Sequence, residues 1–296
     1  MKKFLFQGTG VAMVTPFRKD GSINFNTLSN LVEHLIENNT NFLVVLGTTG
    51  ESVTLTKNEK QAVSSHIIEQ TNGRIPILLG IGGNNTIEII NSIKEQDYNG
   101  VDGLLSVVPY YNCPEQTGIF KHYKEIAMAS PVPIVAYNVP GRTGVNMTAE
   151  TCIKIAHEIK NIVAVKEASG NLKQAMHIIN NKPDDFHIIS GDDFLTFPLI
   201  SLGASGTISV IGNAFPDLLS RMVSNALKGQ ISQARKIHFQ LLDITEMIFS
   251  EGSPAGIKAA LDCLGILHNH LRLPLTPVSR TLYNNISRYI KESKLK

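Results

Sequence analysis

Lys166 is the residue whose position in this sequence most directly predicts chemistry. It follows four apolar residues, Ile162–Val165, in the stretch IVAVKEASGN, and lysine is rarely buried unless it is paired or has a function. Burial disfavours the charged ammonium, so a buried lysine releases its proton more easily. The neutral amine can then attack a carbonyl and form an iminium that accepts electrons. The alternative is that Lys166 extends to solvent or pairs with Glu167, and its position alone leaves both readings open.

The glycine-rich stretch GTTGES, residues 47–52, follows another apolar run and offers a place for a small anion. Thr48 and Thr49 supply hydroxyls, and backbone N–H groups exposed in such a loop can hold a carboxylate. The stretch is not a phosphate-binding P-loop, because no GK[ST] follows it. The plain alternative is a turn that caps a helix.

Two tyrosine-containing stretches and one arginine complete the set of candidates. Tyr110 and Tyr111 lie in PYYN, where paired tyrosines are more often packing or interface residues. Tyr137 closes an apolar run, so its hydroxyl needs a partner or takes part in proton transfer. Arg142 follows in a Pro/Gly loop, where its guanidinium can bind a carboxylate through two hydrogen bonds.

These groups together fit the addition of a keto acid's enamine to an aldehyde. They comprise one buried lysine, hydroxyls for proton transfer, a carboxylate-binding loop and one arginine. They do not fit a metal-assisted aldolase, since the nine histidines form no HExxH motif and do not gather at the ends of the apolar runs. The close pair His268 and His270 favours a surface loop over a metal site.

Eight short apolar runs must position these residues. Each run is apolar through its middle, which is typical of parallel strands covered on both faces. Their spacing of roughly 25–35 residues is that of a βα unit, and eight units predict an α/β fold, a closed (β/α)8 TIM barrel. An open doubly wound sheet is the rival, disfavoured because no GxGxxG fingerprint follows the first run. The runs are residues 10–17, 41–52, 75–85, 101–112, 133–144, 162–171, 187–193 and 206–213.

Helices are expected between and after these runs. Thr56 followed by Glu59 predicts a capping box at the start of one helix. The barrel is expected to occupy residues 1–213. Residues 214–296 show helical patterns and no clear strand, which predicts a C-terminal helical extension packed on the barrel. Catalytic groups of such barrels lie at the C-terminal ends of strands, which is where Lys166 falls.

The composition excludes several classes of protein. The chain has 296 residues, of which 43% are apolar and 18% charged, as expected of a soluble globular protein. A net charge of +2 gives no electrostatic case for a nucleic-acid or membrane-surface partner. No apolar stretch near the start is long enough for a signal peptide, and none approaches the roughly 20 residues that a membrane helix needs. Three widely spaced cysteines, Cys113, Cys152 and Cys263, predict free thiols in a reducing cytoplasm, and the pattern favours small buried apolar groups over a reactive thiol.

The order of the motifs resembles that of one enzyme family. GTTGES, PYYN, YNVPGRTG, VKEASGN, SGDD and GTISV occur at spacings similar to those of the dihydrodipicolinate synthase family of pyruvate-dependent class I aldolases. The likeness extends from about residue 6 to the LRLPLTPVS stretch at 271–279. It implies a carbon–oxygen lyase with 4-hydroxy-tetrahydrodipicolinate synthase activity. Such an enzyme condenses pyruvate with L-aspartate 4-semialdehyde in lysine and diaminopimelate biosynthesis.

The resemblance also implies roles for individual residues. Lys166 would form an imine with pyruvate, and Tyr137 would donate and accept protons above it. Thr48 would link Tyr137 to Tyr111, which in the family reaches into the site of the neighbouring subunit. The other implied contacts are Thr49 with the pyruvate carboxylate, Arg142 with the carboxylate of aspartate semialdehyde, and Gly191 and Ile208 at the wall of the pyruvate pocket.

The family resemblance further implies a homotetramer, a dimer of tight dimers, without an organic cofactor or catalytic metal. Together with the composition, it predicts a cytoplasmic enzyme with two small-molecule substrates and no nucleic-acid or membrane partner. Ser253 stands where the family usually has asparagine, and Lys258, on a predicted helix, is interpreted as structural.

Three other functions compete with this one. N-acetylneuraminate lyases and sugar-acid aldolases resemble it in the barrel, the lysine and the tyrosine, but they generally lack an arginine in the loop of Arg142. A barrel isomerase or synthase that binds phosphate near the SGDD and GASGTISV loops would not use Lys166 and Arg142 together. A non-catalytic barrel that binds small acids is opposed by the full set of reactive groups.

A regulatory site for lysine is the last candidate. Many members of the family are inhibited by lysine at a dimer cleft, and the matching positions here include Ser52, Val53, Asn84, Glu88 and Tyr110. Positions 57 and 60 carry lysines, where strongly inhibited bacterial members carry histidines. Added ammonium groups disfavour a cationic ligand, so we predict weak or absent inhibition by lysine.

Overall fold

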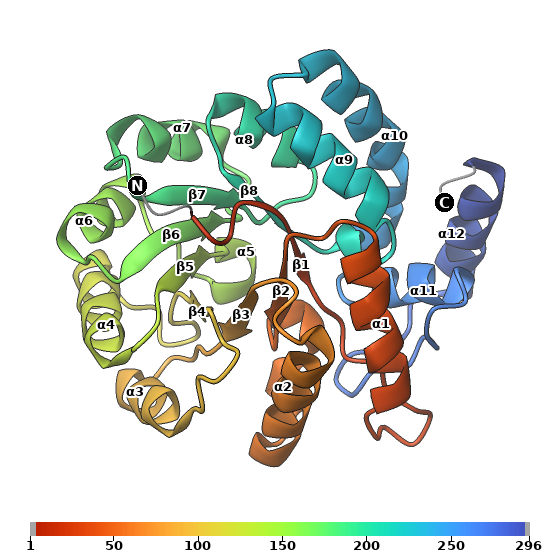
Figure 1. Ribbon diagram of the computed structural model, residues 1–296, viewed down its shortest axis with the longest axis horizontal. Helices are drawn as coiled ribbons and strands as arrows, with labels where there is room; N and C mark the ends of the chain where they lie inside the picture. Colours follow the sequence, from red (N-terminus) through yellow and green to blue (C-terminus); the bar gives the residue numbers. More distant parts are fainter. Residues whose placement is uncertain (1–3, 294–296) are drawn as a thin grey trace.

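The computed structural model describes residues 4–293, in which eight parallel strands close into a barrel surrounded by helices (Figure 1). The strands follow their order in the sequence, and the first pairs with the last to close the sheet. The predicted (β/α)8 barrel is therefore confirmed, and the open sheet is excluded. The strands are β1 (Gly8–Ala12), β2 (Phe42–Val45), β3 (Ile77–Gly80), β4 (Gly103–Val107), β5 (Ile134–Asn138), β6 (Ile162–Glu167), β7 (His187–Ser190) and β8 (Gly206–Ser209).

Every predicted run contains one strand, although β1 begins two residues before its run because the pairing with β8 starts at Gly8. The capping box is present, with the Thr56 hydroxyl accepting from the Glu59 N–H at 3.2 Å and the Glu59 carboxylate accepting from the Thr56 N–H at 2.9 Å. The helices are α1 (Phe25–Glu37), η1 (Thr48–Gly50), η2 (Ser52–Thr54), α2 (Lys57–Thr71), α3 (Thr86–Glu95), α4 (Gln116–Ala129), α5 (Pro140–Thr143), α6 (Ala149–Glu158), α7 (Leu172–Asn181), α8 (Thr196–Leu202), η3 (Ile211–Asn213), α9 (Pro216–Leu227), α10 (Ile231–Ser250), α11 (Ala255–Cys263) and α12 (Arg280–Ser293).

The interior of the barrel is filled by apolar side chains rather than forming a pore. Phe6, from the segment before β1, packs edge-on against Phe42 with ring centroids 5.5 Å apart. Gly10 makes room for that ring, since a Cβ at Gly10 would lie 2.2 Å from Phe42 ring atoms. The other buried members of this inner cluster are Ala12, Val44, Leu78, Leu105, Val135, Tyr137, Val139, Ala164, Ile189 and Ile208.

The two-residue period of a strand decides which side chains join this interior. Ala164 belongs to the inner cluster, so Lys166, two residues later on β6, faces the same side. On β5, Val135 and Tyr137 follow the same rule. Glu167 faces the helices instead, where its carboxylate accepts hydrogen bonds from other residues of the outer layer. The barrel therefore presents one lysine and one tyrosine inward at adjacent strand ends.

Helices α9 to α12 follow the last strand, and α12 lies outermost, on the side of the barrel where α1 and α10 lie (Figure 1). Helix α11 contacts α10, α12 and the short helix η3, which follows β8 in the sequence. A boundary between barrel and extension at residue 213 stays a prediction. Residues 1–3 and 294–296, which were assigned to these two units, lie outside the described residues.

The cysteines are free, as predicted, but only Cys152 is buried. Cys113 is exposed in the loop after β4, and Cys263 is half-buried, so the expectation of buried thiols is wrong for these two. No helix between residues 4 and 293 is both long and apolar enough to cross a membrane.

Candidate active site

Lys166 lies buried at the C-terminal end of β6, with 6% of its surface exposed. Burial lowers the pKa of its ammonium to about 7, the nearby Arg142 guanidinium acts in the same direction, and the Asp193 carboxylate opposes both. Lys166 makes no ion pair within the described part of the chain. Lys166 therefore neither extends to solvent nor pairs with Glu167, because its side chain is buried and Glu167 faces the other side of the sheet. A substantial share of the amine is therefore neutral near pH 7.

Tyr137 lies beside this amine on the neighbouring strand. Tyr137 and Lys166 are register partners between β5 and β6, and Lys166 Nζ lies 4.2 Å from the centroid of the Tyr137 ring. Burial raises the pKa of the Tyr137 hydroxyl, while the Arg142 guanidinium and a hydrogen bond with the Thr48 side chain act against it. A protonated hydroxyl that hydrogen-bonds to a second hydroxyl is suited to passing protons to and from a reacting group.

The 47–51 loop, Gly47 to Glu51, provides the next wall of the site. It contains the short 3-10 helix η1, in which Thr48 is exposed at the cavity and Thr49 is buried. Glu51 ends this turn in the left-handed region with φ 54°, and its N–H donates to the Thr48 carbonyl. The Thr15 hydroxyl, after β1, donates to the Gly50 carbonyl at 2.7 Å. The loop is thereby held by contacts on both sides of its threonines.

The loop after β7 packs directly against Lys166. A Cβ at Gly191 would lie 2.9 Å from Lys166 Cε and Cγ, so only glycine allows this approach. Ile208 is buried on β8, within the inner cluster that also contains Tyr137. Of the two predicted pocket residues, Gly191 therefore packs against the Lys166 side chain, and Ile208 shares the inner cluster with Tyr137.

Asp193 was not singled out from the sequence, although it lies in the SGDD motif. Its carboxylate is buried, and Oδ2 accepts from the N–H groups of Val210 at 2.9 Å and Ile211 at 3.1 Å. Burial raises the pKa of this carboxyl group. Asp193 is an acidic group close enough to affect the protonation of Lys166. The signal in the sequence was a second acid directly after a strand end.

Arg142 is exposed on the short helix α5, at the mouth of the site. Its Nη2 donates to the backbone carbonyl of Ser253, two residues before the start of α11, at 3.0 Å. This contact leaves other N–H groups of the guanidinium available for a carboxylate.

A cavity of about 760 Å3 reaches only part of this set, since Thr49, Gly191 and Ile208 are not on its wall. Its lining includes Thr48, Tyr137 and Arg142, together with Leu46, Gly47 and Val139. Lys166 is not on its wall either, although its Nζ lies close to the ring of Tyr137, which is. The cavity continues between α2 and α3 toward Lys57 and Lys60.

Tyr111 is the predicted catalytic residue that the fold of one chain does not bring into the site. Its side chain is 89% exposed, its backbone adopts φ 74°, and it does not line the cavity. The preceding residue, Tyr110, lines the cavity instead.

The candidate regulatory residues divide into two groups. Ser52, Val53 and Tyr110 line the same cavity, whereas Asn84 and Glu88 do not. Lys60 also lines it, and so does Lys57, whose Nζ forms an exposed ion pair with Glu95 at 2.6 Å.

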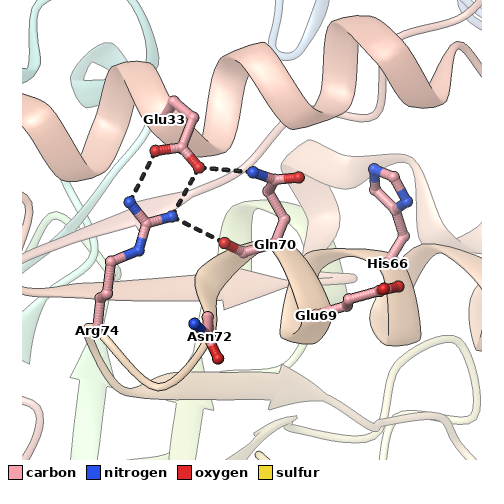
Figure 2. Close-up of a pocket in the computed structure, with 6 residues that line it drawn as sticks. All are labelled: Glu33, His66, Glu69, Gln70, Asn72 and Arg74. Atoms are coloured by element: carbon pink, nitrogen blue, oxygen red, sulfur yellow. Dashed lines mark hydrogen bonds and ion pairs between the residues drawn. The ribbon is translucent and has the colours of Figure 1, made fainter.

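A second cavity of about 600 Å3 lies at the other end of α2 and contains none of the predicted site residues. Figure 2 shows Arg74 bound to the Glu33 carboxylate through both Nη atoms, at 2.7 and 2.6 Å, with Gln70 donating to the same carboxylate. These groups satisfy one another, and the Arg74 hydrogen bonds lower the pKa of Glu33 to about 2. Helix α2 runs back from the end of β2 to the start of β3, so this cavity lies away from the catalytic end of the barrel.

The histidine pair lies in the C-terminal extension, as predicted. His268 is exposed, and the His270 carbonyl accepts a hydrogen bond from Lys258. Among residues 4–293, no group of three or more histidine, cysteine, aspartate or glutamate side chains is arranged to hold a metal ion.

Comparison with known proteins gives consistent matches over nearly the whole chain. The model of the Dihydrodipicolinate synthetase family matches residues 5–293. The 4-hydroxy-tetrahydrodipicolinate synthase of Phocaeicola vulgatus is 52% identical over 290 residues, which is 98% of this chain and 98% of that protein. The crystal structure of the dihydrodipicolinate synthase of Thermotoga maritima superposes with a TM-score of 0.96, at 38% identity, covering 99% of this chain and 100% of that one. The Acinetobacter baumannii enzyme, solved with pyruvate, gives a TM-score of 0.95 at 39% identity, with 98% and 99% covered.

Proposed function

Because the chain belongs to the dihydrodipicolinate synthetase family, we propose that its reaction proceeds through an imine between Lys166 and pyruvate. Its activity is that of a 4-hydroxy-tetrahydrodipicolinate synthase, a lyase of lysine and diaminopimelate biosynthesis. The observation that best supports the imine is the position of the Lys166 amine, which is buried at a strand end and lies 4.2 Å from the centroid of the Tyr137 ring.

The first half of the reaction uses the neutral amine. Lys166 Nζ attacks C2 of pyruvate, and the resulting carbinolamine loses water to give the iminium. Thr49 and the backbone of the 47–51 loop bind the pyruvate carboxylate, while Gly191 and Ile208 form the wall behind it. The iminium withdraws electrons from C2, so a proton leaves C3 and the enamine forms. Tyr137, linked to Thr48, carries protons at these steps.

The second half joins the two substrates and releases the enzyme. The enamine carbon attacks the aldehyde carbon of aspartate semialdehyde, whose carboxylate is bound by Arg142. The amino group of the adduct then attacks C2 and displaces Lys166 by transimination, which closes the ring and restores the free amine. The imine itself supplies the electron sink, so the mechanism calls for no organic cofactor or metal.

Tyr111 belongs to the neighbouring subunit's site in this proposal. Its exposed side chain and its left-handed backbone direct the hydroxyl away from the cavity of its own chain. A tight dimer would place it beside the Thr48 of the partner, and two such dimers would form the homotetramer. We place the assembled enzyme in the cytoplasm, where its substrates are metabolites.

The imine is tested by reduction in the presence of substrate. The protein is incubated with pyruvate, treated with borohydride and digested, and the adduct is located by peptide mass. We expect an adduct on Lys166, which disappears when aspartate semialdehyde is added before borohydride. An adduct that persists with aspartate semialdehyde but is discharged by a sugar aldehyde would instead identify a sugar-acid aldolase, and an adduct on another lysine would disprove the imine at Lys166.

Replacing Arg142 with alanine should raise KM for aspartate semialdehyde by about 100-fold, because hydrogen bonds between charged groups are strong and a whole guanidinium is removed. KM for pyruvate should change by about twofold at most. Arg142→Lys keeps the charge without the two-pronged geometry, so its effect should be intermediate. Steady-state kinetics with each substrate varied in turn give both values, and equal effects on the two substrates would rule out this role.

Lysine should inhibit this enzyme weakly or not at all. Lys60 lines the cavity together with Ser52, Val53 and Tyr110, three of the five residues that the family resemblance assigns to lysine binding, and like charges repel. Lys57 contributes less, because Glu95 already pairs with it. Inhibition is measured as turnover against lysine concentration, with Lys60→His as the variant expected to bind lysine more tightly. Half-inhibition of the unmodified enzyme below about 1 mM, a binding free energy of roughly −4 kcal/mol, would contradict this expectation.

A further inference from the structure

A fully buried ion pair attaches the last residue of the 47–51 loop to the C-terminal extension. Lys258 Nζ is 2.5 Å from Glu51 Oε1, and both side chains are 0% exposed. The two residues are 207 positions apart, on α11 of the C-terminal extension and at the end of the loop that follows β2. Burial of two charges requires close geometry and further hydrogen bonds to be tolerated.

Those further bonds are present. Lys258 also donates to the His270 carbonyl at 2.8 Å and lies 4.3 Å from the centroid of the Phe17 ring. The second carboxylate oxygen of Glu51 accepts from the backbone N–H of Arg272 at 3.1 Å. Both oxygens of Glu51 are therefore bound by residues of the C-terminal extension.

Arg272 fastens the same segment to the N-terminal part of the chain. Its guanidinium donates to the Gly21 carbonyl at 2.7 Å, to the Thr54 carbonyl at 3.0 Å and to the Glu59 carboxylate at 2.5 and 2.9 Å. The group lies 4.7 Å from the centroid of the same Phe17 ring that Lys258 contacts. These bonds fix the segment that supplies the N–H to Glu51.

Backbone hydrogen bonds of Glu51 connect the ion pair with the turn that carries the site residues. It ends η1 with a left-handed backbone, and its N–H closes the turn on the Thr48 carbonyl at 3.1 Å. Its carbonyl accepts from the N–H and the hydroxyl of Thr54, each at 2.9 Å. The position of the Glu51 carboxylate therefore sets the orientation of the turn that carries Thr48 and Thr49.

We propose that the Lys258–Glu51 ion pair positions the 47–51 loop for binding the pyruvate carboxylate. Lys258 and Glu51 are positioning residues, since they act through Thr48 and Thr49 and touch no substrate. The proposal rests on the proposed function in one respect, the binding of pyruvate at this loop. Lys258 is thus more than the structural residue that its place on a helix suggested.

The test compares pyruvate binding in variants of the complete enzyme. Lys258→Met leaves the Glu51 charge buried without its partner, so the loop should shift and KM for pyruvate should rise by about tenfold or more. KM for aspartate semialdehyde should change by about twofold at most. The double variant Glu51→Gln/Lys258→Met removes both charges and keeps an acceptor for the Arg272 N–H, so it should recover much of the lost pyruvate affinity. This non-additivity is what a coupled pair predicts.

Ile286→Ala is the matched control, because it removes a fully buried side chain of α12 in the same extension without touching Glu51. It should lower the melting temperature while leaving KM for pyruvate unchanged. Equal pyruvate KM values for Lys258→Met and Ile286→Ala would overturn the proposal. If Lys258→Met does not fold, Glu51→Gln alone is compared with the control in the same way. If the unmodified enzyme gives no adduct with pyruvate and borohydride, that result contradicts the proposed function rather than the positioning role of the Lys258–Glu51 pair.

Discussion

Lys166→Met is expected to abolish imine formation and to lower turnover by a factor of roughly 10,000 or more, because the variant lacks the nucleophile. Methionine is one atom shorter and lacks the amine, but it keeps an unbranched side chain beside Gly191. No pyruvate should be trapped by borohydride at position 166, while pyruvate should still bind at the 47–51 loop. Turnover and peptide mass measured on the same preparation check both statements.

The same substitution should leave the protein at least as stable as before. Burial lowers the pKa of Lys166 to about 7, so the folded state binds this proton more weakly than the unfolded state. The destabilisation is complete below about pH 7 and fades as the pH rises from there toward the ordinary lysine pKa of about 10.4. The melting temperature of Lys166→Met should therefore exceed that of the unmodified enzyme most at low pH. Lys160→Met, at an exposed position before β6, is the control that should change neither property. Residual turnover near the unmodified level would remove Lys166 from the mechanism.

Tyr137→Phe is expected to lower kcat by a factor of about 100 to 10,000, the usual contribution of a positioned proton donor and acceptor. The ring stays in place against the Lys166 amine, so imine formation with pyruvate should be slowed rather than prevented. Rapid quenching with borohydride at increasing times gives the rate of imine formation, and steady-state assays give kcat.

Tyr98→Phe supplies the comparison for the loss of a phenolic hydroxyl. Tyr98 donates to the Ile93 carbonyl at 3.0 Å, away from the cavity, so its replacement should leave kcat unchanged. A kcat for Tyr137→Phe within about threefold of the unmodified value would show that Tyr137 has no essential proton-transfer role.

The barrel could be predicted because its evidence is local. Each strand is a short apolar run, and the two-residue period that places Ala164 inside also places Lys166 inside. The side on which Glu167 lies follows from the same period. The predicted boundary of the first run was late by two residues, because the backbone pairing of Gly8 with Gly206 leaves no apolar signal.

Two parts of the site could not be predicted in this way. Lys258 interrupts the apolar helix AGIKAAL as Lys166 interrupts a strand, but its partner Glu51 is 207 residues away and no local pattern links them. Asp193 escapes prediction for a different reason, since the sequence of a second acid after a strand end does not distinguish a buried carboxylate from an exposed turn. The pairing of distant charges depends on the packing of α11 against the barrel, which the pattern of a single helix does not contain.

The connection between α11 and the 47–51 loop has a consequence for the order in which the enzyme becomes competent during translation. The ribosome has added Tyr137 and Lys166 long before it adds Lys258 and Arg272. Until those last residues emerge, the Glu51 carboxylate has no buried partner, and an unpaired charge resists burial. On the proposed role of this pair, the nascent chain contains Lys166 before its pyruvate-binding loop is fixed, and the emergence of Lys258 and Arg272 completes that loop.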